Sequence, residues 1–303
     1  MTERSLWLTA PTAAFGEWQT HEAVGADRRP FSARSVVQHR AMFEHFQRHL
    51  HDCGVTVASF GADHIHSLWQ TKAGATYSAA TRMRYLKLLD RLCRHLVSIA
   101  VRDGNPAEEL VRQAQWPDED PSPIYLPQEA DESLQAWIQP SPNDDLAHLR
   151  ARAIVGLFLG TGITAAEGRS ATQVDLQTAA SPPYLHVRGH GARDARTVQV
   201  PPFALPVLTA WSARRATLPI ASDLLFSLTN LGKPIADMGL GRIVRSALVA
   251  IDFEADDMSP RILRNTFCRR QLLAGRDRVE VSELLGLAST RTADRIAATL
   301  PTE

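Results

Sequence analysis

Apolar side chains recur at three- and four-residue steps through most of the chain, which is the spacing of amphipathic helices. Between residues 31 and 113 this pattern predicts a helix that Ser32 caps and that ends near Cys53, a longer helix that Ser78 caps, and a short helix over 107–113. The longer helix has an apolar stripe and a basic side. These features predict a small all-helical domain over 31–113. The basic side of the longer helix consists of Arg82, Arg84, Lys87, Arg91 and Arg94.

The second half of the chain combines helical spacing with two strand-like runs. An apolar helix over 146–158 is stopped by Gly160 and Gly162, and the strand-like runs 184–188 and 197–200 flank a Gly-rich turn that suits a hairpin. Further helical patterns cover 128–138, 203–215, 236–250, 261–275 and 278–286. We therefore expect a mainly α fold with a small β-hairpin or sheet (α+β), and a second domain over 127–303.

Two segments lack such a period. Residues 1–30 mix Trp, Pro, Gly and charge, and we expect them to form an N-terminal arm that is at most partly ordered. Residues 114–126 contain three prolines and the acidic run Asp118, Glu119 and Asp120, a composition typical of an exposed linker.

The charge of the chain is unevenly distributed. Its 33 basic and 33 acidic side chains cancel, but residues 31–105 carry a net charge of +5, residues 106–150 of −8 and residues 151–303 of +4. Local charge sets the field that a bound polyanion feels. The neutral total therefore does not exclude a nucleic-acid partner.

Other classes of protein receive little support. The three cysteines, Cys53, Cys93 and Cys268, form no CxxC pair, which fits inert thiols in a reducing cytoplasm. No signal-peptide pattern and no run of 18 apolar residues appears, so we expect a cytoplasmic protein without membrane contact. His45 and His49 lie four residues apart without a further ligand nearby, and we expect neither a metal nor a cofactor.

Five phrases in order resemble the tyrosine recombinase (phage integrase) family over about residues 31–300. The helical block that ends in DGNPAEEL at 103–110 also resembles the core-binding domain of that family. The phrases are TGITAAEG at 161–168, VRGHGARDARTVQVP at 187–201, LFSLTNLGKPI at 225–235, SPRILRNTF at 259–267 and SELLGLASTRTADRI at 282–296.

The resemblance implies a site of two arginines, a lysine, histidines and a tyrosine nucleophile that attacks a DNA phosphate. In this chain most of those positions hold other residues. The acidic residue after the first arginine is kept as Glu167, and the arginine of the H-x-x-R box as Arg264. The positions of the first arginine, the lysine, the two histidines and the tyrosine fall on Thr164, His190, Arg261, Leu287 and Ile296 (or, with a shift of one, Arg295).

The tyrosine cannot be recovered by realignment. All four tyrosines, Tyr77, Tyr85, Tyr125 and Tyr184, precede the box at 259–267. We therefore expect a recombinase fold without recombinase chemistry and with no catalytic residue.

The remaining cations are candidates for phosphate contact. Arg264 has two open interpretations, a phosphate ligand or a bridge between helices. Arg261 lies one turn away and Arg269 and Arg270 follow, which favours phosphate. His190 at the hairpin tip is expected to have no role. The candidate DNA-binding residues are Arg82, Arg84, Lys87, Arg91, Arg193, Arg196, Arg261, Arg264 and Arg269.

The leading hypothesis is a non-catalytic, sequence-specific double-stranded DNA-binding protein whose two domains clamp a duplex. It would act in recombination, mobile-element or plasmid maintenance, or regulation. One alternative is an active recombinase or integrase with an unusual nucleophile, such as Ser289, Thr290, Thr292 or Thr299, or with residues supplied by a second subunit. Another is a protein-interaction scaffold that uses the acidic linker. We expect a monomer in solution that pairs on DNA.

Overall fold

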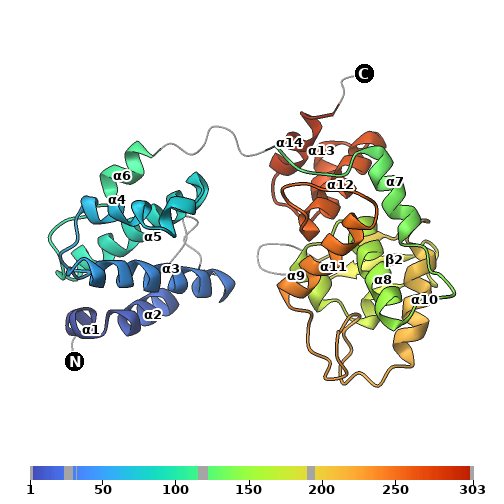
Figure 1. Ribbon diagram of the computed structural model, residues 1–303, viewed down its shortest axis with the longest axis horizontal. Helices are drawn as coiled ribbons and strands as arrows, with labels where there is room; N and C mark the ends of the chain where they lie inside the picture. Colours follow the sequence, from blue (N-terminus) through green and yellow to red (C-terminus); the bar gives the residue numbers. More distant parts are fainter. Residues whose placement is uncertain (1–2, 24–29, 32, 115–121, 190–194, 301–303) are drawn as a thin grey trace. The chain divides into compact units, whose positions relative to one another are not determined.

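The structure is a computed structural model, drawn in Figure 1. The chain divides into two compact units, Met1–Asp120 and Pro121–Glu303, and each has its own hydrophobic core. The residues that the structure describes are 3–23, 30–31, 33–114, 122–189 and 195–300.

The first unit is helical throughout its described part. Ser78 caps α5 as expected, because its hydroxyl accepts a hydrogen bond from Thr81 N. The cap expected at Ser32 lies outside the described residues. The elements are α1 (Glu3–Thr9), α2 (Pro11–His21), α3 (Ala33–Asp52), α4 (Ala62–Gln70), the 3-10 turn η1 (Gly74–Thr76), α5 (Ala79–Ser98) and α6 (Glu108–Gln113).

The N-terminal residues differ from the expected arm. Helices α1 and α2 pack into the core of the first unit, where Trp7, Phe15 and Trp18 are buried. Phe15 stacks on Phe43 of α3 with ring centroids 4.2 Å apart. Pro11 opens the second helix, so the segment is split into helices of 7 and 11 residues. The apolar side chains of this segment show no clear helical period, which is why the sequence did not predict the two helices.

The second unit is built around α8, which Figure 1 shows between α10 and α11. From Ala153 to Thr161 every residue of this helix is buried, so this part of α8 is surrounded by the core on all sides. The helices of the unit are α7 (Gln128–Trp137), α8 (Leu146–Thr161), α9 (Ala165–Ser170), the 3-10 turn η2 (Gln173–Asp175), α10 (Leu205–Ala216), α11 (Asp237–Val249), α12 (Pro260–Leu273), α13 (Arg278–Leu284) and α14 (Arg291–Ala297).

A three-stranded antiparallel sheet completes the second unit, with strand order β1 (Leu176–Gln177), β2 (Tyr184–Val187) and β3 (Arg196–Gln199). Leu185 pairs with Val198, and both side chains are buried in the core. The predicted hairpin is confirmed. The two-residue strand β1 is too short to carry a period and was not predicted. The expected mainly α fold with a small sheet is therefore confirmed.

Candidate functional site

The candidate site lies in the second unit, where the turn after α8 meets α9, β3, α12 and the end of α13. Gly162 ends α8 in the left-handed region (φ 62°), and a Cβ there would lie 2.4 Å from Phe267. Thr164 then caps α9. Its hydroxyl accepts from Glu167 N at 3.3 Å, and Thr164 N donates to the Glu167 carboxylate at 2.7 Å. The position of the family's first arginine is thus a helix cap.

Arg196 and Glu167 form a buried ion pair beside this cap. Arg196 Nη1 and Nη2 donate to the two carboxylate oxygens of Glu167 at 2.8 and 3.1 Å, and its Nε donates to Leu284 O at 2.8 Å. The side chains are 9% and 3% exposed. Burial raises the pKa of Glu167, but hydrogen bonds from Arg196 and Thr164 outweigh it and lower the pKa to about 2. Arg196 is therefore held inside the unit, contrary to the expectation of a phosphate contact.

Arg264 also makes its hydrogen bonds within the second unit. It is 8% exposed, and it donates from Nη1 to Gly162 O at 2.6 Å and from Nη2 to Leu285 O at 2.7 Å. Of its two interpretations, the structure supports the bridge between helices. Arg264 joins the end of α8 to the end of α13 through carbonyls that their helices leave without a partner.

The other arginines of α12 have different neighbours. Arg261 is exposed and donates from Nε and Nη2 to one carboxylate oxygen of Asp257 at 3.0 and 2.7 Å. Arg269 is half-buried over the ring of Tyr125, 5.6 Å from its centroid. Arg270 forms an ion pair with Asp131 at 2.8 Å. The spacing of these residues predicts one phosphate-binding face; in the structure each arginine has a different neighbour, and Arg261 is the exposed one of the three.

The C-terminal positions of the site are apolar. Ile296, at the family's tyrosine position, is fully buried in α14, and Leu287 packs against the same core. Tyr125 lies near this segment, and its hydroxyl is 2.9 Å from Thr299 Oγ1. The hydrogen bonds of Arg264 go to Gly162 O and Leu285 O and not to this tyrosine. His190 and Arg193 lie outside the described residues.

One hydroxyl of this segment has a carboxylate beside it, which sequence reasoning missed. Thr290 Oγ1 donates to Asp294 Oδ2 at 2.7 Å, and Asp294 Oδ1 accepts from Arg278 Nη1 at 3.2 Å. Thr290 is the N-cap residue of α14, and Asp294 lies four positions further on in the helix, a spacing that brings the two side chains together. The Thr299 hydroxyl donates to Ile296 O within its own turn.

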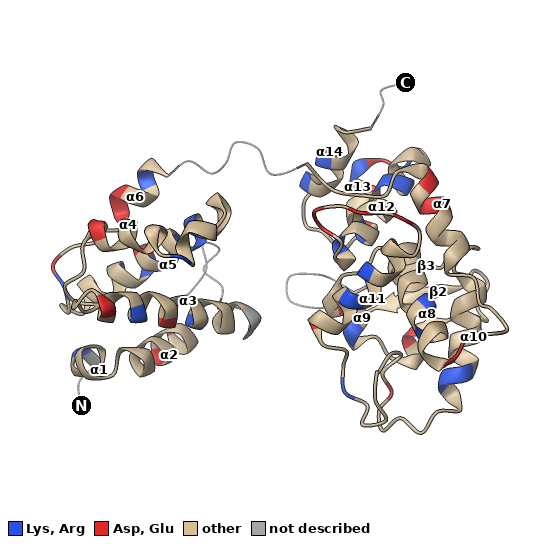
Figure 2. Cartoon of the chain, viewed as in Figure 1, with Lys and Arg blue, Asp and Glu red and all other residues tan. Residues whose placement is uncertain are grey.

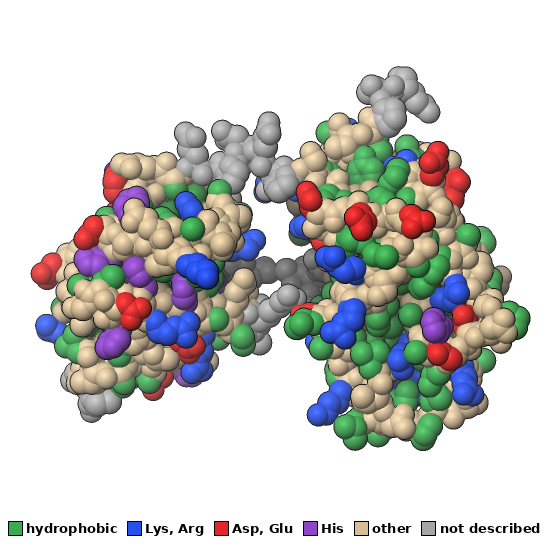
Figure 3. Space-filling model, viewed as in Figure 1, with side chains coloured by type: hydrophobic (Ala, Val, Ile, Leu, Met, Phe, Trp, Pro, Cys, Tyr) green, Lys and Arg blue, Asp and Glu red, His purple; other side chains and the backbone are tan. Residues whose placement is uncertain are grey.

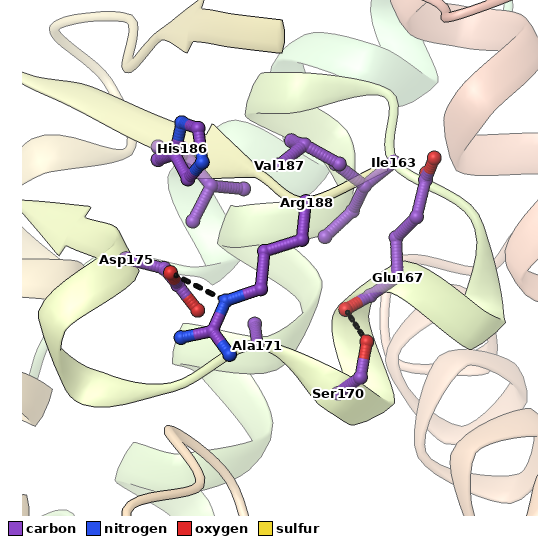
Figure 4. Close-up of a pocket in the computed structure, with 9 residues that line it drawn as sticks. Ile163, Glu167, Ser170, Ala171, Asp175, His186, Val187 and Arg188 are labelled. Atoms are coloured by element: carbon purple, nitrogen blue, oxygen red, sulfur yellow. Dashed lines mark hydrogen bonds and ion pairs between the residues drawn. The ribbon is translucent and has the colours of Figure 1, made fainter. Parts of the chain in front are cut away.

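A cavity of about 10 Å³ lies next to Glu167, at the base of the hairpin. Figure 4 shows Arg188 pointing toward Asp175, with Glu167 and Ser170 on the neighbouring helix. Arg188 Nε donates to Asp175 at 3.1 Å, and its Nη2 donates to Thr172 Oγ1 at 2.9 Å. The cavity has room for a water molecule but not for a nucleotide.

The basic side of α5 is narrower than the sequence indicated. Arg84 and Lys87 are exposed. Arg82 is half-buried near the Trp69 ring, at 5.9 Å from its centroid. The other two expected members are also engaged: Arg91 lies over Phe31, where burial lowers its pKa, and Arg94 pairs with Asp90 on its own helix.

The second unit exposes cations that sequence reasoning missed. Arg242 and Arg245 are exposed on α11, three residues apart. Figure 2 shows Lys and Arg on α5, α9 and α11, and Figure 3 shows basic side chains over the region of α9 and α11. The only acidic residue of α11, Asp237, pairs with Arg169 of α9. The spacing of Arg242 and Arg245 without an acidic partner on their helix was the signal that could have found them.

The described residues contain no group of three or more His, Cys, Asp or Glu side chains that could hold a metal ion. Of the two histidines considered, His45 Nδ1 lies 3.1 Å from the Tyr85 hydroxyl, and His49 Nε2 lies 2.9 Å from Ser67 Oγ. None of the described helices is long and apolar enough to cross a membrane.

No family model matches the chain. It is 31% identical over 188 residues to a protein named tyrosine recombinase XerC of Ralstonia pickettii, an alignment that spans about half (55%) of each chain. It is also 29% identical over 233 residues to XerC of Erythrobacter litoralis, which covers 75% of this chain and 70% of the relative.

Solved structures share the fold at low identity. A XerH recombinase bound to a palindromic difH substrate matches 95% of this chain and 81% of its own, with a TM-score of 0.74 and 16% identity. The Tn1549 transposon integrase in complex with circular intermediate DNA matches 97% of this chain and 95% of its own, with a TM-score of 0.67 and 17% identity.

Proposed function

We propose that this chain, as a member of the tyrosine recombinase family, binds double-stranded DNA sequence-specifically and does not cut it. The solved structures of the same fold carry DNA: XerH its difH substrate, and the Tn1549 integrase its circular intermediate. Exposed cations on both units, Arg84 and Lys87 on α5 and Arg242 and Arg245 on α11, are suited to phosphate contacts.

The proposal that the protein does not cut DNA rests on one observation: the arginines of the site bind groups of the protein itself. Arg196 neutralises Glu167, and Arg264 donates to two main-chain carbonyls, so neither guanidinium is presented to a phosphate. A cleaving site needs such groups aimed at the developing charge. The buried Ile296 supplies no nucleophile at the matched position.

The proposal is tested by selecting bound sequences from a random DNA pool and then measuring mobility shifts on the selected duplex against salt. We expect an enriched motif, and a binding constant that falls steeply with salt because neutralised phosphates release counterions. The absence of any shift at low salt would sink the proposal. In that case the scaffold alternative stands, and a nuclease-treated pulldown would test it. Light scattering without DNA should give a monomer.

A second candidate is an active recombinase that uses Thr290. The contact that favours it is the 2.7 Å hydrogen bond from the Thr290 hydroxyl to Asp294, a possible proton acceptor. Incubation with a nicked form of the selected duplex would trap a covalent protein–DNA adduct if this candidate is correct. We expect no adduct, in the wild type or in Thr290→Ala. The protein would then serve recombination, mobile-element or plasmid maintenance, or transcription as a binding factor.

A further inference from the structure

We propose that the outer edge of β3 and the cleft beside it bind a short extended segment of a partner protein, one that carries an acidic side chain. This surface is separate from the cations assigned to DNA. Among the described residues, β3 pairs with β2 on one side and with no strand on the other. An unpaired strand edge is a template for an added strand.

The ladder determines which main-chain groups face outward. Val200 N donates to Pro183 O, so the Val200–Pro183 pair is the hydrogen-bonded one, and the next pair, Gln199 with Tyr184, is not. The N–H and C=O of Gln199 therefore point away from β2. No hydrogen bond outside the ladder uses them among the described residues.

A cleft of about 200 Å³ lies next to Gln199. Its apolar part is formed by Val198, Phe267 and Leu284, of which the first two are almost fully buried. Pro201, and Gly160 at the end of α8, also line it. This volume suits one aliphatic side chain of a segment that runs along the strand edge. Burial of such a side chain adds to the affinity of the main-chain hydrogen bonds and selects for an apolar residue.

The charge at the rim selects an acidic partner. Arg276 is the one charged side chain among the residues that line the cleft, and it is exposed, with no ion pair among the described residues. Two neighbouring carboxylates are engaged elsewhere, because Asp277 caps α13 by accepting from Val279 N and Glu280 N, and the Glu280 carboxylate accepts from Asp277 N. The Gln199 and Gln271 amides also line the cleft.

The occupant follows from these three features. Side chains two positions apart on a strand lie on the same face, so an apolar residue in the cleft places the residue two positions on beside it. A carboxylate there meets Arg276, while the main chain between them bonds to Gln199. The predicted pattern is an apolar residue, any residue, and then Asp or Glu.

The test is a selection of random hexapeptides displayed on phage against the full chain. The most enriched peptide is then measured by fluorescence anisotropy. We expect the enriched peptides to share the predicted pattern. Arg276→Glu and Gln199→Pro should each weaken binding at least tenfold, because one reverses the rim charge and the other removes the outward N–H. Arg214→Glu, an exposed arginine of α10, is the control and should leave binding unchanged.

Three outcomes would overturn the proposal. They are the absence of any enriched pattern, enriched peptides that bind Arg276→Glu as tightly as the wild type, and a dimer in light scattering that the same variants dissociate. The last outcome would make a second copy of the chain the occupant. Thermal unfolding checks that Gln199→Pro folds. Arg276→Glu changes an exposed turn and decides the matter alone if Gln199→Pro does not fold.

Discussion

At the scale of single residues, the properties of the site depend on which groups each arginine side chain contacts. Glu167 and Arg264 were visible in the sequence as matches to the family, but their partners were not. Arg264 reaches two carbonyls, Gly162 O and Leu285 O, that are 102 and 21 residues away in sequence. Spacing along one helix cannot reveal such long-range acceptors, so the sequence left the role of Arg264 open.

The Arg196–Glu167 pair predicts a large effect of a small change. Glu167→Gln keeps the shape of the side chain but leaves Arg196 buried without a counter-charge, which should lower the free energy of unfolding by about 3–5 kcal/mol. Chemical denaturation measures the loss. The matched control is Glu44→Gln in the exposed Arg40–Glu44 pair, where we expect less than about 0.5 kcal/mol. Equal effects of the two variants would contradict a special role for the buried pair.

At the scale of elements, the predicted helices of both units are confirmed, while the N-terminal pair α1 and α2, and also α4 and α14, were not predicted. Long helices carry several apolar repeats, and α3 and α5 have 20 residues each. The segment of α1 and α2 shows no clear apolar period. Their stability comes from tertiary contacts that no local pattern encodes.

The packing of α1 is tested by one substitution. Trp7→Ala removes a side chain that is 1% exposed and should cost about 3–5 kcal/mol of unfolding free energy through the cavity it leaves. Leu8→Ala is the neighbouring control, since Leu8 is 54% exposed, and its effect should stay within about 0.5 kcal/mol. A small effect of Trp7→Ala would restore the hypothesis of a loosely ordered arm.

The contact of α2 with α3 should respond to pH. His39 Nδ1 lies 3.2 Å from Gln19 Oε1, and burial, followed by the charge of Arg91, lowers the pKa of His39 to about 4. The unfolded chain binds this proton at a pKa near 6.5, so the folded state loses stability as the pH falls from about 6.5 to 4.

His39→Gln should remove part of this pH dependence, about 2 kcal/mol over the interval. Denaturation curves at pH 7, 5.5 and 4.5 measure it. His51→Gln, a variant of an exposed histidine on α3, should keep the dependence of the wild type. An unchanged slope in His39→Gln would show that other groups cause it.

At the scale of the whole molecule, each unit exposes its own cations, although the total charge is zero. If both units contact one duplex, the salt dependence of binding counts the phosphates that they neutralise together. The block charges of +5 and +4 were readable from the sequence. Which side chains expose this charge was only partly readable, because Arg91 and Arg196 are engaged by contacts within their units. The sequence pattern gives no indication of those contacts.

Substitutions on each unit should therefore change the salt dependence by the same amount. Arg84→Ala on α5 and Arg242→Ala on α11 are each expected to reduce the slope of log K against log salt by about 0.9. The double variant should lose about twice that. Arg214→Ala, on an exposed face of α10, is the control. A slope that changes for one unit alone would mean that the other does not bind phosphate.

The buried position of Ile296 has a consequence for the history of the chain. A tyrosine placed there would have to fit a ring into a packed interior and bury its hydroxyl, each at a cost of about 1–3 kcal/mol. A mutational path to a tyrosine at this position therefore passes through a destabilised intermediate unless neighbouring residues change first. Selection for a stable fold alone would then keep position 296 apolar.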